Sequence, residues 1–294
     1  MSAYRFCRTD DVALLVDALN RCWAPYFPGE PPMTPAAFKR SIRDLQVWCS
    51  SCMVAFSGSD PIGVLIGAKR RSGTLVHKIA VHPDHRRQGH GRHLLASLGS
   101  KLAILGPPRI IAEVPETLAP ACGLFSASGY VKEALLTDYV LEGSAVSPVD
   151  APAPGGQIDA ARVGFVIPVT VDDLAANGLL DEAHPQACWK RSVETLTARK
   201  DDIGGLAIAS DERIEAYVLY VTCDMETEIL SLRSFVDDGG AGLRRLVFQL
   251  LTQDRKTFRF SKVYPGEIAV ELLEAVGFSA AGAHQLYAAT AQSV

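Results

Sequence analysis

The sequence predicts an α/β protein built from two similar domains in tandem. Its 294 residues are enough for about two domains at roughly 100–200 residues each. Short apolar runs of strand length alternate with amphipathic helical patterns along the whole chain. A segment rich in proline, glycine and alanine, 143–156, divides the chain, and the order of expected elements before it recurs after it.

The composition of the chain argues against several classes of function. A hydrophobic content of 48% with 21% charged residues is typical of a globular protein. The net charge of −4 argues against a general nucleic-acid partner. No run reaches the 18 or so apolar residues of a membrane span and no apolar signal core opens the chain, so we expect a cytoplasmic protein without a membrane partner.

Seven scattered cysteines do not form the even, spaced set of a disulfide framework. Cys49 and Cys52 have the C-x-x-C spacing of redox and zinc sites. They precede an apolar strand pattern rather than a helix, and no second pair is available as zinc ligands. We therefore expect a structural role for them, and no metal.

The most informative stretch runs from Val76 to Leu95. It reads as a strand, a basic turn containing glycine, and an apolar helix. Such a junction gathers free N–H groups at the positive end of a helix dipole and forms an anion site. The dinucleotide fingerprint fails because Leu94 stands at its third glycine, and the Lys-Ser or Lys-Thr pair of a P-loop is missing.

What remains is Arg86-x-x-Gly89-x-Gly91 after Ile79-Ala80-Val81 and His82-Pro83. This pattern resembles the acetyl-CoA pyrophosphate loop of the GNAT superfamily of N-acetyltransferases. The resemblance covers about residues 3–142 and implies an acyl-CoA N-acyltransferase domain with a mixed sheet over residues 1–142. The expected strands and helices fall in the family's order: 4–7, a helix from 10, a helix from 34, 53–57, 62–68, 76–82, a helix from 91, 109–114, a helix at 117–128, and a closing hairpin from 129–131 through 137–141.

The resemblance also implies where the co-substrate acetyl-CoA binds. The pantetheine arm would pair with the strand edge at Ile79, Ala80 and Val81, and Phe125 would pack beside the sulfur. The family has a proton-donating tyrosine at the Phe125 position, so Tyr130 and Tyr139 are the alternative proton donors. The pyrophosphate would sit on the loop formed by Arg86, Arg87, Gln88, Gly89, His90, Gly91 and Arg92.

Two residues are candidates for the general base. His77 matches one of two histidines that the arylalkylamine acetyltransferases carry on this strand, and histidine side chains titrate near neutrality. Glu113 on the next strand is the second candidate. Leu75 stands where many relatives have a catalytic glutamate.

The second half repeats the pattern with altered charge. A linker at 143–157 leads to a second domain over residues 158–294, in which Leu272 to Phe278 echoes Leu124 to Tyr130 at a distance of 148 positions (272 − 124). Asp237 and Asp238 stand where the first loop has its arginines. Carboxylates repel a pyrophosphate, so we expect a degenerate GNAT-like domain that binds acetyl-CoA poorly or not at all.

The sequence therefore predicts an acetyl-CoA-dependent N-acetyltransferase that acts on a primary amine, with one working site in the first domain. A non-catalytic acetyl-CoA-binding regulatory protein is the alternative, because Phe125 and Leu75 replace expected catalytic residues. A purely structural domain pair is a third class. We expect a small-molecule amine or amino-acid-like acceptor, and a monomer or homodimer.

Overall fold

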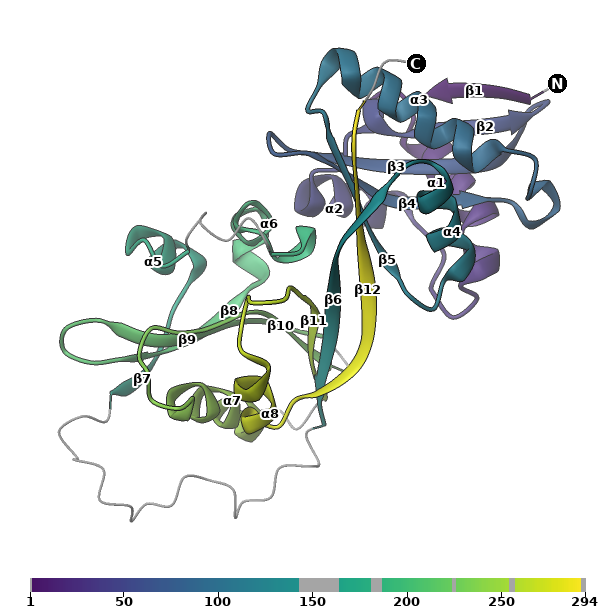
Figure 1. The fold of residues 1–294 in the computed structure, drawn as a ribbon. Helices are drawn as coiled ribbons and strands as arrows, with labels where there is room; N and C mark the ends of the chain where they lie inside the picture. Colours follow the sequence, from purple (N-terminus) through teal and green to yellow (C-terminus); the bar gives the residue numbers. More distant parts are fainter. Residues whose placement is uncertain (1, 143–163, 181–186, 224–225, 254–256, 292–294) are drawn as a thin grey trace. The chain divides into compact units, whose positions relative to one another are not determined.

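A computed structural model describes residues 2–142, 164–180, 187–223, 226–253 and 257–291, and the predicted linker at 143–157 lies outside these ranges. The chain forms two compact units (Figure 1). The first unit consists of the described residues up to Ala134 together with those from Gln285 onward, and the second runs from Leu135 to His284. Both are α/β units with mixed sheets, which confirms the predicted fold class.

The sheet of the first unit begins with four antiparallel strands, and a fifth runs parallel to the fourth. Their order is β1 (Ser2–Phe6), β2 (Met53–Ser57), β3 (Asp60–Lys69), β4 (Thr74–Val81) and β5 (Arg109–Pro115), followed by the end of β12 (Ser279–Thr290). The helices are α1 (Val12–Cys22), α2 (Pro35–Leu45), α3 (His90–Leu105) and α4 (Ala119–Ala127).

Local sequence explains the helices of this unit. The Thr34 hydroxyl accepts a hydrogen bond from the Ala37 N–H at 3.1 Å, and Pro35 occupies the first helical position of α2. Leucines spaced three and four apart give α3 one apolar face. That face packs on the sheet in a buried cluster with Met53, Leu65 and Val76.

The second unit repeats this plan, as the sequence predicts. Its strands follow the order β7 (Phe165–Pro168), β8 (Gly204–Ala209), β9 (Ile214–Thr222), β10 (Glu226–Ser234) and β11 (Thr257–Val263), and β10 runs parallel to β11. A capping box of Thr170 and Asp173 begins the first of its helices. The helices are α5 (Val171–Ala176), α6 (Val193–Ala198), α7 (Ala241–Gln253) and α8 (Val270–Val276).

The predicted hairpin at the end of the first half is wrong. Residues 131–141 form one continuous strand, β6 (Val131–Leu141), whose end pairs with β11 in the second unit through Tyr139↔Phe260 and Leu141↔Phe258. In return, the end of β12 belongs to the first unit, where the Gln285 side chain donates to Ala134 O at 2.7 Å. Each half of the sequence thus completes the other unit (Figure 1).

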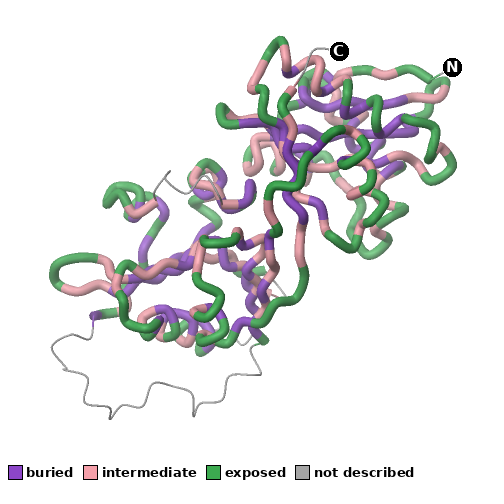
Figure 2. The backbone as a smooth tube through the Cα atoms, in the orientation of Figure 1, coloured by how far each residue is buried: buried purple, intermediate pink, exposed green. Residues whose placement is uncertain are grey.

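The exchange is symmetric in sequence. Tyr139 and Tyr287 are 148 positions apart (287 − 139), the spacing at which the two halves resemble each other. Tyr139 lies in the core of the second unit, and Tyr287 lies in the core of the first. Buried segments follow the strands in both units (Figure 2). Among the described helices, none has both the length and the apolar character needed to cross a membrane.

Candidate functional site

The first unit contains a cavity of about 970 Å³ where two parallel strands separate. β4 and β5 pair only through Thr74↔Ile110 and Leu75↔Ile111. Beyond these pairs the cavity is lined by β4 from Val76 onward and by the end of β5. Its volume is at the upper end of the range found for small-molecule and cofactor sites.

The strand edge facing this cavity carries backbone groups for a ligand. His82 N–H donates to Ile62 O of β3 at 2.8 Å. The direction of backbone hydrogen bonding alternates along an antiparallel strand. The N–H and C=O groups of Ala80 therefore also point to β3, while those of Ile79 and Val81 point to the open side. Val81 O accepts a hydrogen bond from the Tyr26 hydroxyl at 2.6 Å.

His77 occupies a β-bulge at the mouth of the gap between the strands. The register of β3 and β4 steps from Gly67↔Val76 to Ile66↔Lys78, so His77 is the extra residue. Strict alternation therefore does not carry across this point, and the bulge brings His77 to the cavity that Ile79 and Val81 also line. Glu113 lines the cavity from β5.

The basic turn has the backbone conformation of an anion-binding loop. Arg87 (φ +63°) and Gly89 (φ +85°) are both left-handed, and the latter is the residue before the first turn of α3. The first N–H groups of a helix have no partner within the helix and point out along its axis. Arg86 lies over the Tyr26 ring, with 5.6 Å between its guanidinium carbon and the ring centroid.

Gly91 permits α3 to pack closely on α4. A Cβ atom at this position would lie 3.1 Å from the Leu124 side chain. The Arg92 guanidinium donates to Ala127 O at 3.0 Å and fixes the start of α3 to the end of α4. The second glycine of the pattern therefore serves helix packing, and the first serves the turn.

His90 is a buried part of the same loop. Its Nδ1 atom lies 2.6 Å from the Tyr4 hydroxyl, and its buried Nε2 atom has no hydrogen-bond partner within the described part of the chain. Burial, together with the nearby His85 and His93, holds the pKa of His90 below its ordinary value. The ring is therefore neutral at pH 7 and contributes a hydrogen-bonding group rather than a charge.

An aromatic wall with one lysine borders the cavity on the side of α1. The rings of Trp23 and Phe27 stack with centroids 4.4 Å apart. Lys78 Nζ lies 4.1 Å from the centroid of the Trp23 ring and 3.4 Å from a Glu30 carboxylate oxygen. Burial lowers the pKa of Lys78, and Glu30 opposes that shift.

Phe125 lines the cavity, and Tyr287 from β12 supports its ring. Its ring stacks on Tyr287, with centroids 5.6 Å apart and an interplanar angle of 22°. The Ser126 hydroxyl donates to the Tyr287 oxygen at 3.5 Å. Tyr130 also contacts the Phe125 ring, but it is buried outside the cavity lining, and burial raises its pKa. Tyr139 lies in the second unit, so neither tyrosine considered as an alternative donor lines this cavity.

Every predicted site residue except Gln88 lines the cavity. Sequence reasoning missed the wall formed by Trp23, Tyr26 and Phe27, and it missed Lys78. The clustering of three aromatic residues just before the Pro28-Gly29 break was an available signal.

The paired cysteines lie away from the cavity lining. Cys49 and Cys52 are buried free thiols, and burial raises the pKa of both. A thiol held protonated in this way is a poor nucleophile and a poor metal ligand. Within the described ranges, no group of three or more His, Cys, Asp or Glu side chains could hold a metal ion.

Comparisons with known proteins agree with this geometry. Residues 15–130 match the model of the acetyltransferase (GNAT) family. No curated protein matches the sequence. Among solved structures, the chain is similar to a tandem GNAT protein from the clavulanic acid biosynthesis pathway, with 15% identity, 99% of each chain covered and a TM-score of 0.68.

Two further structures show the same fold over nearly the whole chain. A GCN5-related N-acetyltransferase from Sphaerobacter thermophilus has 14% identity and a TM-score of 0.66, with 99% of this chain and 96% of that chain covered. A putative acetyltransferase from Pyrococcus horikoshii has 15% identity and a TM-score of 0.64, with 99% and 90% covered. The loop and the separated strands lie within residues 15–130, which the family match assigns to the acetyltransferase (GNAT) family, and the full-length likenesses show that the whole chain has the fold of tandem two-domain GNAT proteins.

Proposed function

We propose that the chain is an acetyl-CoA-dependent N-acetyltransferase with its working site in the first unit, acting on a primary amine of a small molecule. One observation carries the proposal. The gap between β4 and β5 brings a strand edge, a candidate base and an anion loop to the same cavity.

The residues present fit acetyl-CoA. The N–H groups from Arg87 to Arg92 offer donors to a pyrophosphate, and the positive end of α3 and its arginines supply the opposite charge. The open edge offers an extended pantetheine arm the N–H and C=O of Ile79 and the N–H of Val81, whose carbonyl already accepts from Tyr26. When bound, acetyl-CoA supplies the thioester carbonyl that the amine attacks.

The chain's own groups then have distinct tasks. His77, or Glu113 across the gap, takes the proton that the attacking amine must lose. The N–H groups of the open edge donate to the oxygen on which negative charge develops. Phe125 lines the cavity where the leaving sulfur would lie and has no proton to give, so the sulfur would depart as a thiolate, which a thiol with a pKa of about 8–9 tolerates.

Lys78 supports an amino-acid-like acceptor. Lys78 is paired with the exposed Glu30, and an acceptor that also carries a carboxylate gains a second ion partner for Lys78 at this wall of the cavity. Lys78→Met should raise KM for amines that carry a carboxylate and leave KM unchanged for the matching amines without one. An equal rise for both sets would contradict this role.

A non-catalytic acetyl-CoA-binding protein is the second candidate, and Phe125 favours it because it stands where the family's proton donor is found. Two measurements separate the candidates. Calorimetric titration with acetyl-CoA tests binding, and detection of free CoA thiol with a panel of primary amines tests transfer. Binding without amine-dependent thiol release would favour the regulatory protein, and the absence of binding would exclude both.

A further inference from the structure

The counterpart of the cavity in the second unit can be located by strand register. In the first unit His77 is the bulged residue, two positions after Leu75, which pairs with Ile111. In the second unit Leu230 is the bulged residue of β10, two positions after Glu228, which pairs with Arg259. Leu230 therefore corresponds to His77.

The same register identifies the residue of the second unit that corresponds to Glu113. Glu113 lies two positions after Ile111, and Ser261 lies two positions after Arg259. Both candidate bases of the first unit are thus replaced in the second by side chains that do not titrate near neutrality. The space between β10 and β11 also differs from the space between β4 and β5.

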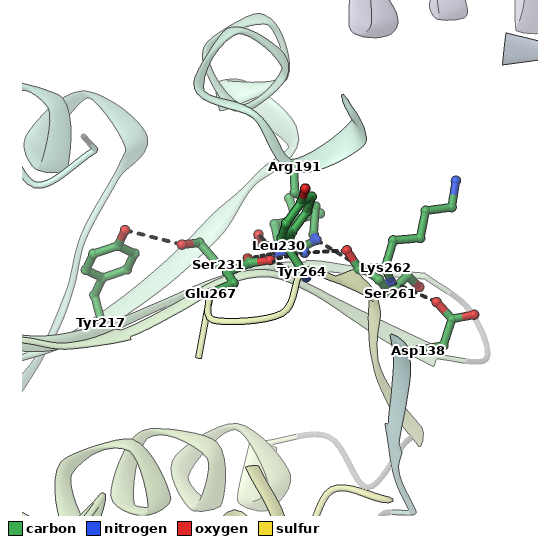
Figure 3. A network of polar contacts seen from close by, with 9 residues as sticks. All are labelled: Asp138, Arg191, Tyr217, Leu230, Ser231, Ser261, Lys262, Tyr264 and Glu267. Atoms are coloured by element: carbon green, nitrogen blue, oxygen red, sulfur yellow. Dashed lines mark hydrogen bonds and ion pairs between the residues drawn. The ribbon is translucent and has the colours of Figure 1, made fainter. Parts of the chain in front are cut away.

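Arg191 fills the gap between β10 and β11 (Figure 3). Its guanidinium donates to Leu230 O of β10 at 3.5 Å and to two carbonyls of β11, Ser261 O at 2.9 Å and Lys262 O at 3.0 Å. The side chain is only 1% exposed, and it lies 4.5 Å from the centroid of the Phe260 ring. Three carbonyl oxygens at the gap are therefore already hydrogen-bonded to the protein's own cation.

Glu267 completes this closure. Its carboxylate forms a two-pronged ion pair with Arg191, with one oxygen 2.7 Å from the guanidinium, and the same oxygen accepts from Tyr264 N–H at 3.0 Å. The carboxylate is 12% exposed. A buried charge with its counter-charge and hydrogen bonds satisfied is costly to displace, because the partner left behind would stay buried and unpaired.

The second loop is occupied in a similar way. The Asp238 carboxylate accepts from Gly240 N–H at 2.9 Å and from Gly242 N–H at 2.7 Å. These glycines correspond to Gly89 and Gly91 of the first loop. A carboxylate of the chain itself therefore takes the amides that would otherwise face an anion.

We infer that the second unit is closed to acyl-CoA by Arg191 in its strand gap and by Asp238 in its loop, so that one chain binds one acyl-CoA. The inference rests on the proposed function, because it assigns the single site to the first unit. The gap is closed by a residue that lies outside both the loop and the strands.

Calorimetric titration of the full chain with acetyl-CoA tests the inference. We expect one molecule bound per chain. Arg86→Glu, which reverses a charge in the first loop without changing the backbone, should weaken that binding at least tenfold. Arg244→Glu, the matched reversal beside the second loop, should leave affinity and stoichiometry unchanged.

Two molecules bound per chain, or a second binding event that persists in Arg86→Glu and is lost in Arg244→Glu, would overturn the inference while leaving the proposed function intact. Absence of any binding to the unaltered chain would instead overturn the proposed function, and the one-site claim with it. Far-ultraviolet circular dichroism and thermal unfolding of both variants show whether each is folded.

Discussion

Tyr287 offers the sharpest test of how the first site is built, because it reaches that site from the far end of the sequence. Its side chain is fully buried and stacks on Phe125, which lines the cavity. Truncating a buried aromatic side chain to alanine costs about 3–5 kcal/mol, and loss of the ring pair accounts for roughly 0.5–1.5 kcal/mol of that. Tyr287→Ala should therefore lower the free energy of unfolding by about 3–5 kcal/mol.

The same change should loosen Phe125 and weaken acetyl-CoA binding about tenfold, which corresponds to roughly 1.4 kcal/mol. Tyr287→Phe removes only the long 3.5 Å hydrogen bond with Ser126 and should cost no more than about 1 kcal/mol. Urea unfolding gives the stabilities, and calorimetric titration at a temperature where the variants are folded gives the affinities.

Tyr139→Ala is the matched control. Tyr139 is the equivalent residue of the first half, but it lies in the core of the second unit. Its truncation should destabilise the chain by a similar amount and leave acetyl-CoA affinity unchanged. Wild-type affinity in Tyr287→Ala, or an equal loss of affinity in Tyr139→Ala, would refute the proposed support of Phe125 by the exchanged strand.

Three further predictions concern the loop, the candidate base and the exchanged strand. Gly89→Val should reduce acetyl-CoA affinity at least tenfold, because φ is +85° there and side-chain-bearing residues adopt such angles at a cost of about 1–2 kcal/mol; unchanged affinity in titration would remove the loop assignment. His77→Ala should lower kcat by about 10²–10⁴ and flatten its pH profile while acetyl-CoA still binds, whereas His93→Ala, outside the cavity lining, should not; equal kcat across pH in both would exclude His77 as base. Burial raises the pKa of Asp138, but His284, whose Nδ1 lies 3.4 Å from the carboxylate, and the hydrogen bond from Lys262 N–H together hold that pKa below the ordinary value of 3.8. The stabilising effect of the carboxylate is therefore full above 3.8 and is lost as pH falls through the lower folded value. Asp138→Asn should therefore lower stability at pH 7 and lessen its fall on acidification, and a parallel fall in wild type and variant would show that this carboxylate plays no part.

The loop and the elements around it could be predicted because their signals are local. Gly89 follows a strand and precedes a helix with evenly spaced leucines, and each of these patterns spans fewer than about 20 residues. The same holds for the capped starts of α2 and α5 at Thr34 and Thr170. Local chemistry decides such features, and the structure has them where the sequence places them.

The strand exchange could not be predicted in this way. The residues of β6 favour a strand whether the partner is a neighbouring hairpin arm or a strand more than 100 residues away, because side-chain alternation does not encode the partner. The predicted hairpin failed for this reason. The bulge at His77 is similarly invisible, since it depends on the register with β3.

The buried position of Arg191 could not be predicted from the sequence either. In the sequence, Arg191 is one basic residue between Lys190 and Ser192, and such a position is typical of an exposed cation. Only the tertiary structure brings it between β10 and β11, with Glu267 as its counter-charge. Its burial depends on partners 39 to 76 positions away in the sequence.

Amine-dependent release of CoA thiol from acetyl-CoA decides whether the chain is an N-acetyltransferase. The unaltered chain should release thiol at a rate that saturates with both acetyl-CoA and a primary amine that carries a carboxylate, and His77→Ala should lose most of that rate with binding retained. Bound acetyl-CoA with no thiol release above spontaneous hydrolysis, for any amine of the panel, would contradict the assignment as an N-acetyltransferase.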